Sequence, residues 1–448
     1  MKRFLFLIGL LFITLSLFAH PDIEPLFTPD DFLEEKRELS STSVLTADEV
    51  FRLSLLFSEC KLESETAARC LAKFEKIKTE VTSPDFMNQS PEERGRAILK
   101  LLYRDYLRTY DFDQTKTDVA LETGVYNCVS SALIYMAAAK ASGLEVRGQR
   151  TTQHAFCSVY VPVENSQQLQ KIDVETTNPY GFNPGSRETI ENEANIKKYY
   201  IVPKKYYSNR QEISDCNLAG LIAGNICSTC IKKKDYARGI PLGATRYEMV
   251  RQENTNFTAN VRQDFDVLIA NYVNILPPTA EKFSEVLDWF TTVLGRWGVT
   301  DFLQKNMDNA YNNLIILCLK EKNNVLAEEY FQKYQNYVTK NQQRKTEQLY
   351  KETVWLYQLN DYMTSKDYQS GLQKAEEALK ELPDNQKIKN MRTNFYNNCI
   401  SVIHNRFAKE ANAGHFDAAL QILTEGLQDF PEDRILKKDL ADLKKVMQ

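Results

Sequence analysis

The sequence is poor in histidine and cysteine, and neither sign of charge dominates. It has four His and nine Cys in 448 residues, and cysteines so sparse and odd in number do not make a disulfide framework. Lys and Arg (56) nearly balance Asp and Glu (60), which excludes the basic footprint of a nucleic-acid-binding domain. No Gly-rich phosphate loop, HExxH motif or calcium loop is present. We therefore expect no metal, no other cofactor and no nucleic-acid partner.

The N-terminus has the pattern of a secretory signal. Lys2 and Arg3 precede an uncharged run of 16 residues, Phe4–Ala19, and a Pro-containing polar segment follows. Cleavage after Ala19 is expected, although Leu17 is larger than the residue usual two positions earlier, so an uncleaved anchor remains an alternative. We expect an exported protein of the periplasm or cell envelope, with membrane contact only through an uncleaved N-terminal segment.

The pattern of hydrophobic residues divides the rest of the chain into three parts. Residues 20–45 are polar and contain several Pro, which predicts a linker. Residues 46–210 are expected to form an α+β domain, helices first and then a small antiparallel sheet. Its helices are expected at 47–59, 65–79, 91–110 and 123–143, after a loop at 111–122, and its strands at 146–150, 154–163 and 171–175.

Residues 211–448 carry a weak repeat of helix pairs. Aromatic or apolar residues recur at matching places with spacings of 47, 42, 43 and 48 residues, at Tyr236, Phe283, Val325, Tyr368 and Phe416. Helix pairs with a period near 40 are typical of solenoids. The pattern resembles tetratricopeptide (TPR) repeats with lengthened helices, and it predicts an all-α TPR-like domain that binds a protein or peptide partner.

The longest feature without charge inside the chain surrounds Cys128. No charged residue occurs from Thr123 to Ala139, and a helix apolar on all sides belongs in a core. Cys128 lies in its first turn, where the helix dipole favours a thiolate. A thiol nucleophile needs a base, and His154, on a predicted strand, is the one His outside the N-terminal boundary and the distal repeats. Asp173 follows on the next strand as a candidate third member.

These residues occur in segments that together resemble a known family. YNCVSSALIYMAAAKASG, QHAFCSVYV and KIDVETT are similar to the transglutaminase-like core of the papain-like cysteine enzymes, and a core followed by helical repeats looks like bacterial SirB1-type proteins. The resemblance implies a triad of Cys128 as nucleophile, His154 as base and Asp173 as the residue that orients the His. Glu175 shares the predicted strand face of Asp173 and is the alternative acid.

The oxyanion hole would use the backbone N–H of Cys128, with Asn127 or Gln153 as a possible second donor. The predicted function is acyl transfer at amide bonds, either as a peptidase or amidase or as a cross-linking enzyme. The alternative is a non-catalytic envelope scaffold that uses both domains for protein binding, because a fold does not determine a function. Cys227 and Cys230 form a CxxC pattern without a second pair, which we interpret as core packing, with a disulfide that involves Cys216 as the alternative.

Overall fold

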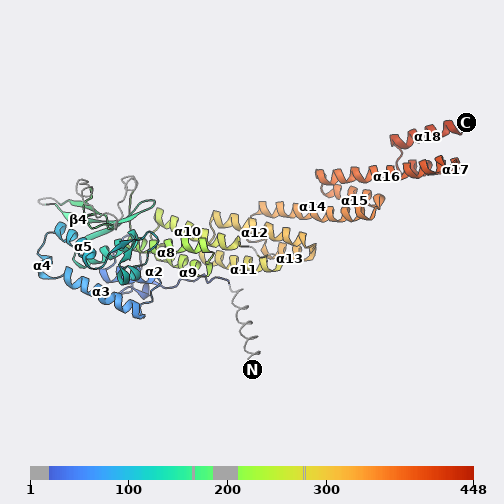
Figure 1. The fold of residues 1–448 in the computed structure, drawn as a ribbon. Helices are drawn as coiled ribbons and strands as arrows, with labels where there is room; N and C mark the ends of the chain where they lie inside the picture. Colours follow the sequence, from blue (N-terminus) through green and yellow to red (C-terminus); the bar gives the residue numbers. More distant parts are fainter. Residues whose placement is uncertain (1–19, 164–166, 185–209, 276, 278, 448) are drawn as a thin grey trace, which may run out of the picture. The chain divides into compact units, whose positions relative to one another are not determined.

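The computed structural model describes residues 20–163, 167–184, 210–275, 277 and 279–447, and the expected signal segment 1–19 lies outside this part. The chain is mostly helical with small sheets. Its contacts divide it into two compact units, Met1–Ile275 and Leu276–Gln448, and Figure 1 shows their elements. No helix in the described ranges has the length and apolar character needed to cross a membrane.

The first three helices begin where the sequence predicts them, but the third ends at Asp105 and not at Tyr110, because residues 109–110 form a short strand. They are α2 (Ala47–Phe57), α3 (Glu65–Val81) and α5 (Pro91–Asp105). Thr46, Ser64 and Ser90 cap them by accepting a hydrogen bond from the backbone N–H three residues later. A short helix, α4 (Pro84–Met87), connects α3 to α5. The fourth predicted helix, α7 (Cys128–Ala141), begins five residues later than expected, because residues 125–126 form a short strand. It ends near Gly143, whose φ of 74° is the left-handed conformation expected after a helix.

The predicted antiparallel sheet has four strands in the order β5-β4-β3-β6. They span β3 (Glu145–Arg150), β4 (Ala155–Pro162), β5 (Leu169–Val174) and β6 (Gln211–Ile213). Helix α7 packs against β3 and β4. The Cys157 thiol contacts the Ala132 carbonyl oxygen of α7 at 3.3 Å, so the Cys157 face of β4 is the face that α7 covers, as the alternation predicts.

The predicted loop at 111–122 contains regular structure that the sequence did not indicate. Helix α6 (Thr117–Thr123) occupies its second half and ends at Gly124, whose φ is 80°. Two short strands flank this helix, β1 (Thr109–Tyr110) and β2 (Val125–Tyr126), and they pair in parallel. This pairing fixes the chain immediately before α7 and therefore the start of that helix.

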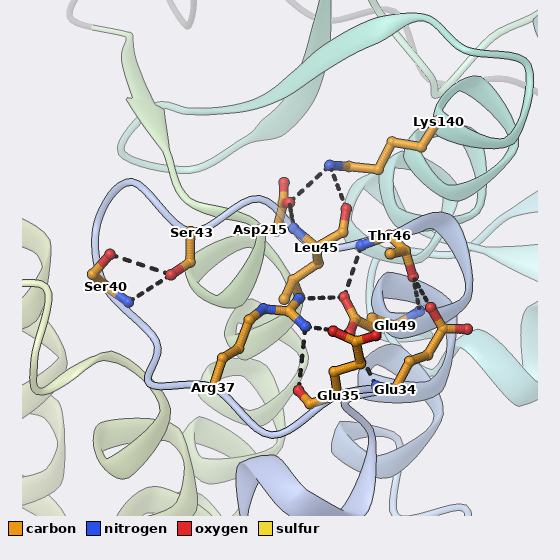
Figure 2. A network of polar contacts seen from close by, with 10 residues as sticks. All are labelled: Glu34, Glu35, Arg37, Ser40, Ser43, Leu45, Thr46, Glu49, Lys140 and Asp215. Atoms are coloured by element: carbon orange, nitrogen blue, oxygen red, sulfur yellow. Dashed lines mark hydrogen bonds and ion pairs between the residues drawn. The ribbon is translucent and has the colours of Figure 1, made fainter.

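The predicted linker at 20–45 is packed along the first unit, and only a short 3₁₀ helix, η1 (Pro29–Asp31), interrupts its extended course. Its apolar side chains Phe27, Phe32, Leu39 and Leu45 are buried, which is why this segment is not a free linker. Arg37 binds the buried Glu49 carboxylate of α2 with both guanidinium nitrogens, at 2.8 and 2.5 Å (Figure 2).

The segment also connects to the helices that follow the sheet. The backbone N–H of Leu45 donates to Asp215 at 3.0 Å, and Lys140 of α7 donates to the Leu45 carbonyl and to Asp215, both at 2.9 Å (Figure 2). Asp215 begins α8 (Asp215–Lys233), which packs against α2, α7 and β3. Helices α9 (Tyr236–Val250) and α10 (Asn256–Val273) pack against α8.

Because of this packing, α8, α9 and α10 belong to the first compact unit. The contacts divide the chain at 275/276, whereas the sequence analysis places the domain boundary at 210/211. The repeat pattern indicates pairs of helices, and α8 and α9 form such a pair as the later helices do. The pattern does not indicate which other part of the protein a helix packs against. Leu218 of α8 is fully buried and packs over Gly148 of β3, where an added Cβ would lie 3.2 Å from it, whereas Gly220 and Gly224 face Arg246 of α9.

The second unit consists of helices that pack on their sequence neighbours and, along α12, α14, α16 and α18, on the next helix but one. The bounds are α11 (Ala280–Trp297), α12 (Asp301–Lys320), α13 (Asn324–Tyr334), α14 (Lys340–Ser365), α15 (Tyr368–Glu381), α16 (Gln386–Asn412), α17 (Phe416–Asp429) and α18 (Arg434–Val446). Tyr368 and Phe416 begin α15 and α17, as the repeat predicts, whereas Val325 is 81% exposed. Helices α14 and α16 have 26 and 27 residues.

Candidate functional site

Cys128 is the first residue of a helix that is buried for three turns. Every residue from Cys128 to Ala139 is buried, and Asn127 caps the helix through its side-chain oxygen, which accepts from the backbone N–H groups of Val129 and Ser130 at 2.9 and 3.2 Å. The Cys128 N–H is one of the first four in the helix, which have no acceptor within it. The thiol thus lies at the positive end of the helix dipole.

His154 lies at the turn between β3 and β4. Its carbonyl oxygen accepts from the Thr151 N–H at 2.8 Å, which closes the turn. The His154 side chain is 3% exposed, and its ring stacks with the Phe156 ring, with 6.0 Å between the ring centres. Nε2 of His154 lies 2.6 Å from a carboxylate oxygen of Glu175.

The charge on this imidazole follows from its two neighbours. Burial alone would lower the pKa of His154, but the Glu175 carboxylate and a hydrogen bond with the Cys128 thiol outweigh it and raise that pKa to about 10. Since Glu175 contacts Nε2, the nitrogen that remains for the thiol is Nδ1. The raised pKa favours the imidazolium form of His154, which lies between a carboxylate and a sulfur atom.

Glu175 is fixed by a tight turn that follows β5. Its second carboxylate oxygen accepts from the backbone N–H and the hydroxyl of Thr177, at 3.1 and 2.7 Å. The backbone N–H of Glu175 donates to the Gly181 carbonyl at 2.8 Å. A Cβ at Gly181 would lie 1.8 Å from the Glu175 carbonyl oxygen, so the close approach requires Gly at this position. The hydroxyls of Thr176 and Ser131 lie 3.0 Å apart and join the turn to α7.

Asp173, the first choice for the orienting acid, does not contact His154. Its carboxylate accepts from the Ser158 hydroxyl at 2.8 Å and pairs with Arg210. The strand register explains this correction, because Asp173 lies opposite Ser158 on β4. Ser158 is four residues beyond His154, or roughly 13 Å along a strand. Glu175, two residues further along the antiparallel partner, is correspondingly nearer to His154 and occupies the position expected of the acid.

The two candidates for the second oxyanion donor differ in their surroundings. Asn127 is 2% exposed, its side-chain oxygen caps α7, and its amide nitrogen donates to the Phe112 carbonyl at 3.3 Å. Gln153 is exposed in the turn before His154. Both line the same cavity as Cys128, and the Asn127 amide nitrogen is already engaged by the Phe112 carbonyl.

The sulfur and the imidazole face a cavity of about 680 Å³. Its walls come from the loop at 112–116, the start of α7, the turn at 150–155, and one side of α8 with the start of α9. Leu221 and Asn225 of α8 belong to this wall, and the Asn225 amide donates to the Thr115 hydroxyl at 2.9 Å. Exposed Phe112 also lines the cavity, with 72% of its surface accessible. The sequence analysis did not identify Phe112, Thr115, Leu221 and Asn225 as candidates, because nothing in the sequence indicates that they lie near Cys128.

A buried Cys–His–Glu constellation open to a cavity is the observation that defines the site. Comparison of the chain with protein families, curated proteins and solved structures gives no match. The site is therefore interpreted from its own geometry.

The remaining cysteines are packed away from this cavity. None of the nine forms a disulfide, and burial raises the pKa of the other eight thiols, including Cys70, Cys227 and Cys318 to about 12, 12 and 11. Cys227 and Cys230 are buried on α8 without a disulfide, and Cys227 contacts the Gly239 carbonyl at 3.4 Å. They pack in the core, as the sequence analysis expects.

Proposed function

We propose that this chain is a thiol-dependent acyl-transfer enzyme of the papain-like, transglutaminase-like type. The observation that carries the proposal is the hydrogen-bonded series of Cys128, His154 and Glu175 at one wall of a large cavity. A nucleophile, a base and a residue that orients the base are the parts that this chemistry requires. A Cys at a helix start, a His at a strand start and an acid beyond the neighbouring antiparallel strand also support the family resemblance.

In the proposed reaction, the Cys128 sulfur attacks an amide carbonyl carbon and the carbonyl oxygen becomes an oxyanion. The N–H of Cys128 at the helix start would donate to that oxygen. The His154 imidazolium gives its Nδ1 proton to the amine as the C–N bond breaks, which leaves a thioester. Neutral His154 then takes a proton from water or an amine, and the attack of that group releases the acyl product and the thiolate. We favour water as the acceptor, which would make the enzyme an amidase or peptidase.

Selective alkylation tests this proposal. Treatment of the folded protein with iodoacetamide at pH 6, with the modified residue mapped by mass spectrometry, is expected to label Cys128 at least about tenfold faster than any other cysteine. An ordinary thiol is only about 0.3% ionised at pH 6, because its pKa is about 8.5, whereas an adjacent imidazolium favours the thiolate. Cys128→Ala removes the signal and serves as the control. Equal labelling of all nine cysteines would favour the non-catalytic scaffold instead.

We further propose that the second unit binds an extended peptide segment of a protein partner in the cell envelope. A cavity of about 350 Å³ lies among residues of α14 and α16, lined by Asn360, Met363, Met391, Asn394, Asn397 and Asn398. An Asn amide both donates and accepts, as a peptide backbone does, and Met adapts to varied apolar side chains. Export itself is proposed from the N-terminal pattern alone.

The double variant Asn394→Ala/Asn397→Ala should lower the capture of envelope proteins by at least about tenfold, while Asn405→Ala, an exposed residue of α16 outside this cavity, leaves capture unchanged. The readout is quantitative mass spectrometry of captured proteins. Equal capture by the double variant and the wild type would show that these amides do not bind the partner.

A further inference from the structure

The cavity beside Cys128 carries more cationic than acidic side chains. Its lining includes Lys116, Arg150, Lys232 and Arg238, against the single carboxylate of Asp113. Lys116 and Arg238 both bind Glu59, at 2.7 and 2.6 Å, so two cations share one carboxylate. Lys232 is exposed at the last turn of α8. A cavity with this excess favours a substrate that brings negative charge.

Arg150 is linked through the sheet to the residue next to the catalytic His. It is the last residue of β3 and pairs across the strands with Ala155, the residue that follows His154. It also pairs with Gln211 of β6, so its backbone is held from both sides. Arg150 therefore lies at the fixed end of a strand and lines the same cavity as Cys128 and His154.

The guanidinium of Arg150 has an aromatic contact but no ion pair in the described part of the chain. It lies 5.4 Å from the centre of the Phe257 ring of α10. Burial, and then the nearby Arg246 guanidinium, lower the pKa of Arg150, and Asp264 only partly opposes them. Asp264 itself pairs with Arg246 at 2.7 Å. A bound anion would offset the repulsion between the two guanidinium groups, which stay charged at neutral pH.

We propose that Arg150 binds a carboxylate of the acyl substrate, so that the enzyme acts on amide bonds close to an acidic group. The planar guanidinium suits a carboxylate because it can donate two parallel hydrogen bonds. The carboxylate would come from an acidic side chain or from a free C-terminus next to the scissile amide. This assignment rests on the proposed acyl-transfer function and adds the substrate class to it.

The test compares two alkylating agents of similar size, iodoacetate, an anion, and iodoacetamide, which is neutral. The ratio of their rates of Cys128 labelling isolates the recognition of charge, because the reactivity of the thiol affects both reagents equally. Arg150→Gln is expected to lower the iodoacetate-to-iodoacetamide ratio about tenfold, the size expected for a hydrogen bond to a charged group. Arg150→Lys should retain part of the preference.

Arg147→Gln is the matched control, since Arg147 lies on the same strand, is exposed and pairs with Glu145 and Glu212 away from the cavity. Its ratio should equal that of the wild type. An unchanged ratio in Arg150→Gln, with both reagents still labelling Cys128, would overturn the assignment of Arg150 and leave the acyl-transfer proposal standing. If neither reagent labels Cys128 in the wild type, the acyl-transfer proposal is itself overturned, together with this assignment.

Three tripeptides distinguish the two sources of the carboxylate by their protection of Cys128 from iodoacetamide. Acetyl-Ala-Glu-Ala amide offers only a side-chain carboxylate, acetyl-Ala-Ala-Ala only a terminal one, and acetyl-Ala-Ala-Ala amide neither. Protection by one of the first two that is lost in Arg150→Gln identifies the source. Equal protection by all three peptides would contradict carboxylate recognition.

Discussion

His154→Ala and Glu175→Gln are each expected to slow the alkylation of Cys128 by iodoacetamide at pH 6 by roughly 10²-fold. The estimate follows from the thiolate fraction, since a thiol without an adjacent imidazolium is about 0.3% ionised at that pH. Asp173→Asn should change the rate by less than about threefold, because Asp173 binds Ser158 and Arg210 and not the imidazole. The measurement is the pseudo-first-order rate of labelling for each variant.

The hydrogen bonds around Glu175 explain why the Glu175→Gln substitution should slow the labelling of Cys128 so strongly, although Gln has nearly the same shape as Glu. Thr177 donates to one carboxylate oxygen from its backbone N–H and its hydroxyl, so the amide oxygen of the Glu175→Gln variant would stay on that side. The amide NH₂ would then face Nε2 of His154 and require it to accept. The proton would move to Nδ1, where the imidazole can no longer take a proton from the thiol, the wrong tautomer for a base.

The comparison of Asp173→Asn with Glu175→Gln tests which acid orients His154. Near-UV circular dichroism of all three variants shows whether packing is retained. If Asp173→Asn slows labelling as much as Glu175→Gln, the assignment of Glu175 from the strand register is wrong. If neither His154→Ala nor Glu175→Gln slows it, Cys128 does not react as part of a pair.

The second large effect concerns stability at alkaline pH. The pKa of His154 is raised from an ordinary 6.5 to about 10 in the folded protein. Its imidazolium therefore stabilises the fold fully below about pH 6.5, and this contribution declines as the pH rises and is lost through about pH 10. We expect the loss to amount to a few kcal/mol of unfolding free energy, since each pKa unit corresponds to about 1.4 kcal/mol.

Urea unfolding of the wild type and of His154→Gln between about pH 6.5 and pH 10 measures this effect. The difference in unfolding free energy between the two proteins should shrink steadily as the pH rises, because the variant has no group with this shift. Groups that titrate in the window without contacting His154, such as the other eight thiols and Tyr, occur in both proteins and cancel in the difference. A constant difference across the range would show that His154 is not held as an imidazolium.

Local patterns were sufficient for the parts of the site that depend on near neighbours along the chain. The charge-free run predicts α7 because a helix without a polar face must be buried, and the start of this helix places Cys128. Alternation along 154–161 predicts β4 and its faces. With two of the four His in the distal repeats and one at the N-terminal boundary, His154 was the remaining partner for the thiol.

The choice between the two acids needed the tertiary structure. Asp173 and Glu175 are two residues apart and share a strand face, so alternation cannot separate them; only the register does, and register depends on the pairing of β4 with β5. The turn through Gly181, which fixes the Glu175 carboxylate, also needed the structure. It brings Gly181 against the Glu175 backbone, and a periodic sequence pattern does not predict this contact.

The far wall of the cavity and the course of residues 20–45 were also decided by tertiary packing. By itself, the sequence determined a Cys-bearing buried helix, a strand that begins beside the one available His, and a chain that continues as helix pairs. It did not determine that α8 and α9 supply one wall of the cavity that Cys128 lines, or that the Leu45 N–H donates to Asp215. Those contacts join residues that are far apart in the chain. The packing that brings them together follows from the burial of apolar surface, which does not depend on sequence order.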